Sequence, residues 1–147
     1  MRLWHYKLIP YLDKQRLVAQ WRECCCIAKN IANNGTPNHL LVNKILEYPS
    51  IHFNIYTRMV IEEMGIRGYN IKKDAYDKFY TNIQIGQCYF RDNHYKTNQV
   101  INREVFPYWH TDRYLKQCLL NLQEKFDCYG INPTEWHKIC ENFEVYM

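Results

Sequence analysis

The chain has 147 residues, of which 47 % are hydrophobic and 16 % aromatic, so its composition excludes a disordered polypeptide and predicts a single domain over residues 1–147. A formal net charge of +4, without a polybasic tract, permits phosphate binding but does not require it. No apolar run approaches the roughly 20 residues that a membrane-spanning helix needs, so we expect a protein that acts without a membrane.

The chain contains seven cysteines, three of them contiguous at Cys24, Cys25 and Cys26. No C-x-x-C pair occurs, whereas zinc ligands usually lie about two to four residues apart, so we predict no metal and no cofactor. The odd count, with no secretory signal before it, also disfavours a disulfide framework. We therefore expect small core thiols in a cytoplasmic protein.

The first nine residues are apolar and aromatic, with basic residues interspersed. An apolar segment of this kind is unfavourable in water, so we expect Leu3, Trp4 and Leu8 to anchor it against the body of the protein. Pro10 follows, and its fixed φ and missing N–H suit the start of a helix.

A long helix is predicted from Tyr11 to about Ile31, where apolar residues recur at three- and four-residue spacing before an Asn-Asn-Gly stop. At about 100° per residue, Glu23 lies near the radial direction of Arg16 and Ala19 and off the apolar stripe. Glu23 is then either a surface residue paired with Arg16 or Arg22, or a carboxylate that faces a cleft.

Two further helices are predicted in the middle of the chain, over residues 39–48 and 50–67. Pro49 separates them, and we expect Ser50 to cap the second helix. Gly68 then stands where a left-handed residue ends a helix.

The segment 73–109 is rich in Tyr, Asn, Asp and Lys and has no sustained period. A short helix over residues 74–80 fits the pattern, and residues 83–90 fit a helix or an extended segment. Tyrosines in such a segment could stack on bases, but we interpret it as an irregular insertion that covers the core.

The last part of the chain again has helical signals. Thr111 is expected to cap a fourth helix, and Asn132-Pro133 followed by Glu135 resembles a capping box that opens a terminal helix in a C-terminal extension of residues 126–147. The fold class is therefore all-α, a bundle of about four to five helices.

The sequence lacks a glycine-rich phosphate loop, a G-x-S-x-G elbow and an H-E-x-x-H motif. The candidate catalytic groups are the terminal amine of Met1 and the carboxylate of Glu23. An α-amino group has a reference pKa near 7.7–8.0, so a useful fraction of such amines is a neutral nucleophile at physiological pH. A carboxylate in the same cleft could transfer protons at a sugar, and Arg2 and Arg22 could bind phosphates.

Four stretches of the chain carry a resemblance to known proteins. They are MRLW...LIP.L..QRL..Q.RECC at residues 1–25, H..VN at 39–43, Y...V.EEM..RGY at 56–69 and HTDRYL..CLLNL at 110–122. Together they resemble the pyrimidine dimer DNA glycosylase family of the phage endonuclease V type, and within it a branch of small bacterial members. The segment 73–109 has no counterpart in this resemblance.

The resemblance implies a compact helical fold with the N-terminal segment packed between the helices, and a protein that acts on damaged double-stranded DNA. We expect a monomer, although the sequence leaves the oligomeric state open. It also implies two linked reactions, N-glycosylase action by the terminal amine and β-elimination at the resulting abasic site (AP lyase activity). Carried over by position, the nucleophile is Met1 and the catalytic carboxylate is Glu23. The residues that we expect to contact DNA are Arg2, Arg16, Arg22, His39 and His110.

Two departures from the phage pattern stand out. The phage enzyme reacts through a threonine amine exposed by removal of the initiator methionine, whereas here Arg2 is too bulky for normal removal and Met1 should persist. Cys26 replaces an arginine, which affects dimer specificity more than lyase chemistry.

Two other functions stay open, a non-catalytic DNA- or protein-binding module on the same fold and a cysteine-based redox or transfer enzyme. The sequence also leaves the lesion open.

Overall fold

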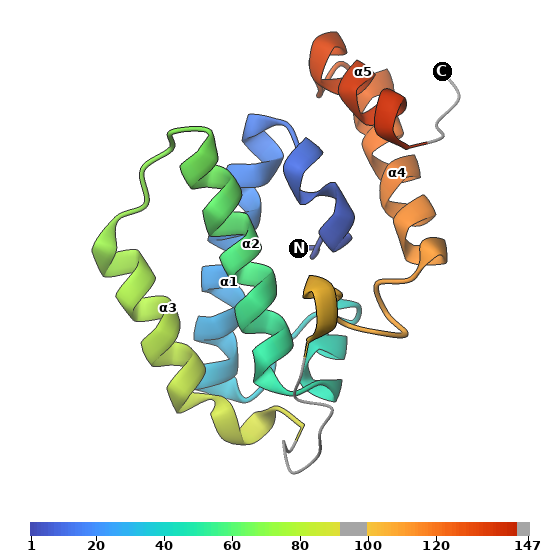
Figure 1. Ribbon diagram of the computed structural model, residues 1–147. Helices are drawn as coiled ribbons and strands as arrows, with labels where there is room; N and C mark the ends of the chain where they lie inside the picture. Colours follow the sequence, from blue (N-terminus) through green and yellow to red (C-terminus); the bar gives the residue numbers. More distant parts are fainter. Residues whose placement is uncertain (92–99, 144–147) are drawn as a thin grey trace.

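The computed structural model describes residues 1–91 and 100–143 (Figure 1). Its five α-helices are α1 (Lys14–Asn34), α2 (Ser50–Ile66), α3 (Lys73–Ile85), α4 (Asp112–Asp127) and α5 (Pro133–Asn142). A short 3-10 helix, η1 (Tyr6–Tyr11), precedes α1, and others lie between the α-helices, namely η2 (Val42–Glu47), η3 (Gln87–Tyr89) and η5 (Ile101–Arg103). The described residues contain no strand, which confirms the predicted all-α class.

Helices α1, α2 and α3 lie side by side and form one half of the described fold (Figure 1). The ring of Trp21 on α1 lies 6.0 Å from the ring of Phe79 on α3, and Phe53 on α2 lies 5.5 Å from the same ring. Buried aromatic rings contribute large apolar areas, so these contacts fix the three helices to one another. The helix α1 ends where the sequence predicts, at Gly35 with a φ of 74°.

The short helix predicted over residues 74–80 lies within α3, which extends to Ile85, so the first part of the expected irregular insertion is regular. Its buried residues are Phe79 and Ile83, and Ala75 and Tyr80 also pack against the core. A Cβ at Gly86 would lie 2.7 Å from a methyl carbon of Ile31, so glycine permits the close approach of this segment to α1. Residues 92–99 of the expected insertion lie outside the described residues.

The N-terminal segment passes between α2 and α4 (Figure 1). Leu3 and Leu8 are fully buried and Trp4 is nearly so, which confirms that the first nine residues are anchored in the core. Pro10 lies inside η1 and does not open the long helix, which begins three residues after η1, at Lys14.

The segment predicted as a helix over residues 39–48 is instead a loop followed by the 3-10 helix η2. The side chain of Asn43 accepts hydrogen bonds from the backbone N–H of His39 and the hydroxyl of Thr36. Such local side-chain bonds compete with helix formation.

The helix α2 agrees with the prediction except at its first residue. Pro49 is its N-cap, and Ser50 lies in the first turn, where its hydroxyl bonds the side chain of Gln87. Gly68 has a φ of 78°, in the left-handed region that the sequence predicts.

The last two helices begin as the sequence predicts. The Thr111 side chain accepts the N–H of Tyr114 at the start of α4, and the Asn132 side chain accepts the N–H of Thr134 at the start of α5, with Pro133 as its first residue. Phe126 and Trp136 stack and join α4 to α5. Residues 144–147 of the expected C-terminal extension lie outside the described residues.

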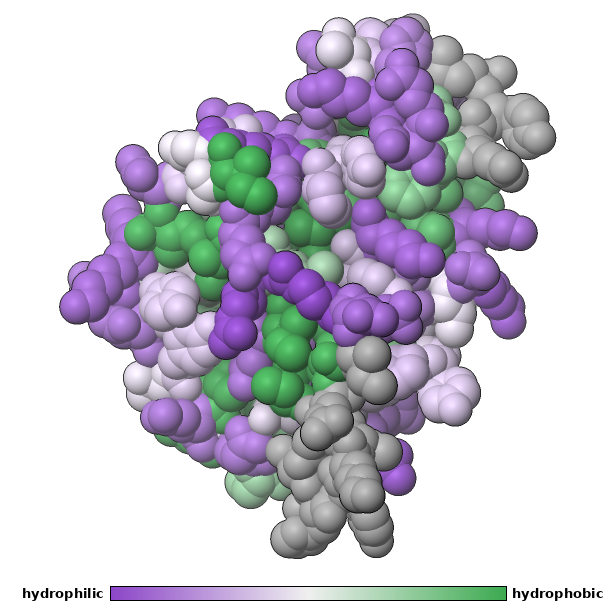
Figure 2. All heavy atoms as spheres, viewed as in Figure 1, coloured by the Kyte–Doolittle hydropathy of each residue, from purple (hydrophilic) through white to green (hydrophobic). Residues whose placement is uncertain are grey.

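The view in Figure 2 shows mostly hydrophilic side chains, with apolar groups exposed in small separate areas. Among the described residues, no helix has both the length and the apolar character that crossing a bilayer requires.

Candidate active site

Two side chains on α1 bond the backbone of the first four residues. The backbone N–H of Arg2 donates to Oε2 of Glu23 at 3.0 Å. Gln20 accepts the N–H of Trp4 at 2.9 Å and donates its amide N–H to the carbonyl of Arg2 at 2.9 Å. Since Gln20 and Glu23 lie three residues apart, on one face of the helix, α1 fixes the direction in which the chain start points.

Two buried tyrosines hold the other side of this segment. The hydroxyl of Tyr56 donates to the carbonyl of Trp4 at 2.6 Å, and the hydroxyl of Tyr114 donates to the carbonyl of Leu3 at 2.6 Å. Burial raises the pKa of both hydroxyls well above the usual value, so both stay protonated donors. Helices α1, α2 and α4 together therefore position the N-terminal segment.

Met1 and Glu23 line one pocket of about 290 Å³. The pocket is lined by Met1, Arg2, Trp4, Gln15, Arg16, Ala19, Gln20, Glu23, Asn121 and Lys125. Met1 is 43 % exposed, and three backbone bonds join its nitrogen to that of Arg2, so this nitrogen lies within roughly 7 Å of Oε2 of Glu23. Glu23 thus shares a pocket with Arg16 and Ala19, as the helical geometry predicts.

Arg16 lines this pocket, but its guanidinium is engaged within the protein. Nη1 bonds Oδ2 of Asp13 at 3.1 Å and the carbonyl of Gly130 at 2.7 Å. These bonds join α1 to the loop before α5, and a Cβ at Gly130 would lie 3.2 Å from the guanidinium. The structure therefore shows that Arg16 joins α1 to the loop before α5, and its expected contact with DNA stays a prediction.

Arg2 separates the pocket from a second cavity. The guanidinium carbon lies 5.5 Å from the ring centroid of Trp4 and 5.9 Å from that of Tyr114, within cation–π range. The same residue lines an open cavity of about 720 Å³ beside η2, whose other lining residues are His39, Leu40, Leu41, Asn43, Lys44 and Glu47. Arg2 and His39 are therefore neighbours at the mouth of the site.

Arg22 is exposed and does not line the pocket of Met1 and Glu23. It faces a neighbouring cavity of about 690 Å³ together with Lys14 and Gln15, and Gln15 also lines the pocket. One residue along a helix turns the side chain by about 100°, which separates Arg22 from Glu23.

His110 lies in the core and not at the site. Its Nδ1 accepts the N–H of Tyr6 at 3.2 Å, and its ring stacks on His5 with centroids 5.2 Å apart. Burial, with a smaller effect of His5, places the pKa of His110 well below its usual value. A buried neutral imidazole cannot reach a phosphate, so the structure replaces the expected DNA contact by a packing role.

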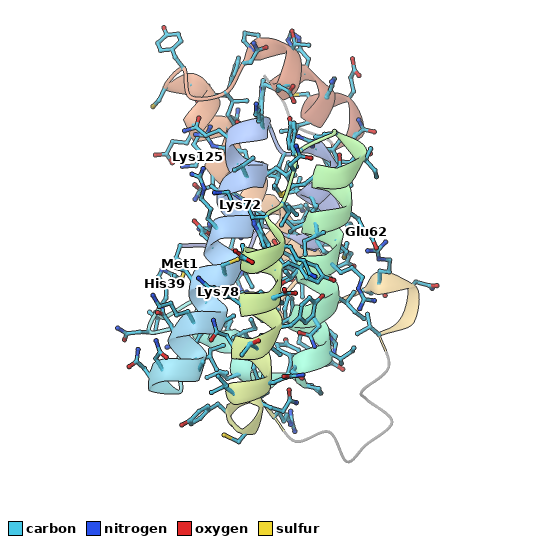
Figure 3. The ribbon with its side chains drawn as sticks, turned by 90° about the vertical axis from the view of Figure 1, so that its left-hand side faces the viewer. Met1, His39, Glu62, Lys72, Lys78 and Lys125 are labelled. Atoms are coloured by element: carbon cyan, nitrogen blue, oxygen red, sulfur yellow. The ribbon has the colours of Figure 1, made fainter. Side chains whose placement is uncertain are left out.

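Figure 3 shows Met1 and His39 next to each other on the side of α1, with Lys125 farther along that side and Glu62 on the opposite one. Lys125 comes from the last turn of α4 and lines the pocket. The sequence did not lead us to predict Lys125 and Gln20 as residues of the site. Gln20 carries a signal, because a polar residue three positions before Glu23 shares its face, whereas nothing local marks Lys125.

The structure disfavours thiol chemistry at Cys24 and Cys25. Burial raises the pKa of Cys25 to about 11 and that of Cys24 further, so neither forms a thiolate nucleophile at neutral pH. Within residues 1–91 and 100–143, no group of His, Cys, Asp and Glu residues is arranged to hold a metal ion.

Comparison with known protein families identifies one match. The model of the family described as pyrimidine dimer DNA glycosylase matches residues 1–77, which is just over half of the 147 residues. Comparisons with curated proteins and with solved structures gave no match. The matched segment contains α1 and the whole N-terminal segment that it positions, with Met1, Gln20 and Glu23. The chain therefore belongs to the pyrimidine dimer DNA glycosylase family, a family of DNA-repair enzymes.

Proposed function

We propose that this chain is an N-glycosylase/AP lyase that acts on damaged double-stranded DNA, with the amino group of Met1 as nucleophile and Glu23 as the proton-transfer group. The observation that carries the proposal is the common pocket of Met1 and Glu23, together with the hydrogen bond from the Arg2 N–H to Glu23. Pyrimidine dimers are the substrate that the family description suggests. The proposal requires that Met1 has a free α-amino group.

The first reaction releases the base. The lone pair of the neutral Met1 nitrogen attacks C1′ of the damaged nucleotide, and the bond from C1′ to the base breaks, so the base leaves with the electron pair. The amine then loses a proton, and the bond from C1′ to the ring oxygen opens as a Schiff base forms. Glu23 assists by giving a proton to the ring oxygen.

The second reaction cleaves the strand. Glu23, now a carboxylate, removes a proton from C2′, and the electron pair forms a C2′–C3′ double bond while the bond from C3′ to its oxygen breaks. The phosphate on that oxygen leaves with the downstream strand, and water later hydrolyses the Schiff base. Two steps that share one carboxylate need it close to both C2′ and the ring oxygen, which a pocket shared with Met1 supports.

The hydrogen bonds of Glu23 fit this role. Within the described residues, Oε2 receives the Arg2 N–H at 3.0 Å and lies 3.5 Å from the amide nitrogen of Gln20. Both bonds go to the same oxygen, so the carboxylate is oriented while Oε1 is left for substrate. Orientation of a proton-transfer group in this way is a large part of its effect.

DNA binding is attributed to cations around the pocket. Lys125 lines the pocket itself, Arg2 lies at its mouth, and Lys44 and Arg22 lie in the two flanking cavities. Contacts of this kind bind phosphates and fix the register of the duplex without reading its sequence. The damaged nucleotide must leave the base stack to reach a pocket of this size.

Borohydride trapping tests the proposal. Reduction of the Schiff base should join the protein covalently to a duplex that contains an abasic site, and the same duplex should be cleaved when borohydride is absent. A variant with a short N-terminal extension is the control, because the extension turns the nitrogen of Met1 into an amide. Binding of the duplex without trapping or cleavage would instead indicate the non-catalytic module.

A further inference from the structure

Leu40 stands out on the surface beside the candidate site. Its side chain is 94 % exposed, whereas the next two residues are held by the core, Leu41 partly buried and Val42 fully buried. Exposed aliphatic side chains are common on proteins, so exposure alone assigns no role. The loop that carries Leu40 and the residues around it indicate a role.

The loop that carries Leu40 is preformed. Asn43 accepts the N–H of His39 at 3.1 Å through its side chain and donates its own N–H to the carbonyl of His39 at 2.8 Å. The N–H of Val42 donates to Nδ1 of His39 at 3.3 Å, and Asn38 adopts a positive φ of 58° before the turn. A side chain on such a support loses little backbone entropy when it inserts into another molecule.

The surroundings of Leu40 suit a nucleic acid. It lines the cavity of about 720 Å³ together with Arg2, His39 and Lys44, and Arg2 also lines the pocket of Met1 and Glu23. Figure 3 shows His39, the residue before Leu40, next to Met1. The apolar side chain of Leu40 therefore lies in a cavity with two cations, Arg2 and Lys44, and one carboxylate, Glu47, and this cavity shares Arg2 with the pocket of Met1 and Glu23.

We propose that Leu40 is a wedge that inserts between the bases of the duplex beside the lesion and holds the damaged nucleotide out of the stack. This inference rests on the proposed function and adds a positioning residue to it. Leucine is among the apolar side chains that DNA-bending proteins insert between base steps, and unstacking a step costs a few kcal/mol. Without the wedge, the displaced nucleotide would return to the stack before Met1 reacts.

The test compares Leu40→Ala and Leu40→Phe with the wild-type protein. Ile66→Ala is the matched control, because Ile66 is an aliphatic residue that is 80 % exposed at the opposite end of α2 from η2. All four proteins bind a duplex that contains a non-reactive tetrahydrofuran site with 2-aminopurine beside it, and unstacking of the 2-aminopurine raises its fluorescence. This measurement does not require a reaction at the site, so it tests the insertion of Leu40 whether or not the protein cleaves DNA.

We expect a rise in fluorescence with wild type, Leu40→Phe and Ile66→Ala, and a rise at least several-fold smaller with Leu40→Ala. We also expect Leu40→Ala to cleave a duplex abasic site about tenfold more slowly, with unchanged cleavage of a single-stranded one, since no stack must be opened there. An equal fluorescence rise with Leu40→Ala, or an equal loss of cleavage on single and double strands, would overturn the wedge. Failure of the wild-type protein to trap DNA would reject the proposed lyase chemistry separately.

Discussion

The backbone N–H of Arg2 and the carboxylate of Glu23 are joined by a hydrogen bond of 3.0 Å. Because Arg2 follows Met1, this one bond relates the position of the proposed nucleophile to that of the proposed proton-transfer group. Gln20, Tyr56 and Tyr114 bond the backbone groups of the next two residues, Leu3 and Trp4. The geometry of the site is therefore a property of the packed core and not of a mobile terminus.

Replacement of Glu23 by Gln tests proton transfer by this residue separately from its hydrogen bond to the Arg2 N–H. The amide oxygen of Gln can still accept the Arg2 N–H, but it cannot remove a proton. We expect strand cleavage to fall about 100-fold or more, with duplex binding within about twofold of wild type because no cationic group is lost. Gel assays of cleavage and fluorescence anisotropy of a labelled duplex measure the two effects. Cleavage at the wild-type rate would reject this role for the carboxylate.

Replacement of Gln20 by Leu removes the two bonds that position the N-terminal backbone. The N–H of Trp4 would lose its acceptor in a buried place, so we expect a loss of about 1–3 kcal/mol in the free energy of unfolding. Trapping should slow as well, because the amine of Met1 loses its fixed direction. Gln117→Leu, at an exposed position of α4, is the control and should leave unfolding in urea unchanged. A wild-type trapping rate in the Gln20 variant would argue against positioning by α1.

The two arginines on α1 should behave differently. Arg22 is exposed in a cavity beside the pocket, so Arg22→Ala should weaken duplex binding and reduce the slope of log affinity against log salt by about 1. Arg16 is bonded to Asp13 and Gly130, so Arg16→Ala should leave the salt slope unchanged and cost about 1–3 kcal/mol of stability. Salt titrations and urea melts distinguish the two, and the reverse pattern would contradict the assignment.

Acid should destabilise the protein through its buried histidines. Burial lowers the pKa of His5 to about 4 and that of His110 well below the usual value, so both are neutral when folded. The unfolded chain binds these protons near pH 6.5, so stability is complete above about pH 6.5 and falls as the pH drops toward 4. Urea melts at pH 7.5 and 5 should show the loss. His110→Asn should reduce it, whereas the exposed His137→Asn should not.

The sequence predicts the helices with strong periodicity and clear ends, which include α1, α2 and α4. It predicts only part of α3, a short helix over residues 74–80, because only Phe79 and Ile83 are buried in this otherwise polar helix. It fails at residues 39–48, where the side chains of Thr36 and Asn43 accept hydrogen bonds from the backbone N–H groups of Asn38 and His39. In each case the deciding contacts are tertiary or come from single polar side chains.

The candidate site was predictable in part. The radial position of Glu23 follows from helix geometry, and the burial of Leu3 and Trp4 follows from their apolar character. Nothing in the sequence indicates that the guanidinium of Arg16 donates a hydrogen bond to the carbonyl of Gly130, which is 114 residues away. His110 was misplaced for the same reason, because its partner Tyr6 lies 104 residues away in the chain.

The most direct measurement locates the covalent bond. After borohydride trapping on a short duplex with one abasic site, the protein is digested with trypsin and the adduct mapped by mass spectrometry. The account predicts that the reduced sugar is found on the α-amino group of Met1, in the peptide that ends at Arg2, and that an N-terminal extension abolishes it. An adduct on a lysine such as Lys125, or trapping that persists with the extension, would contradict it.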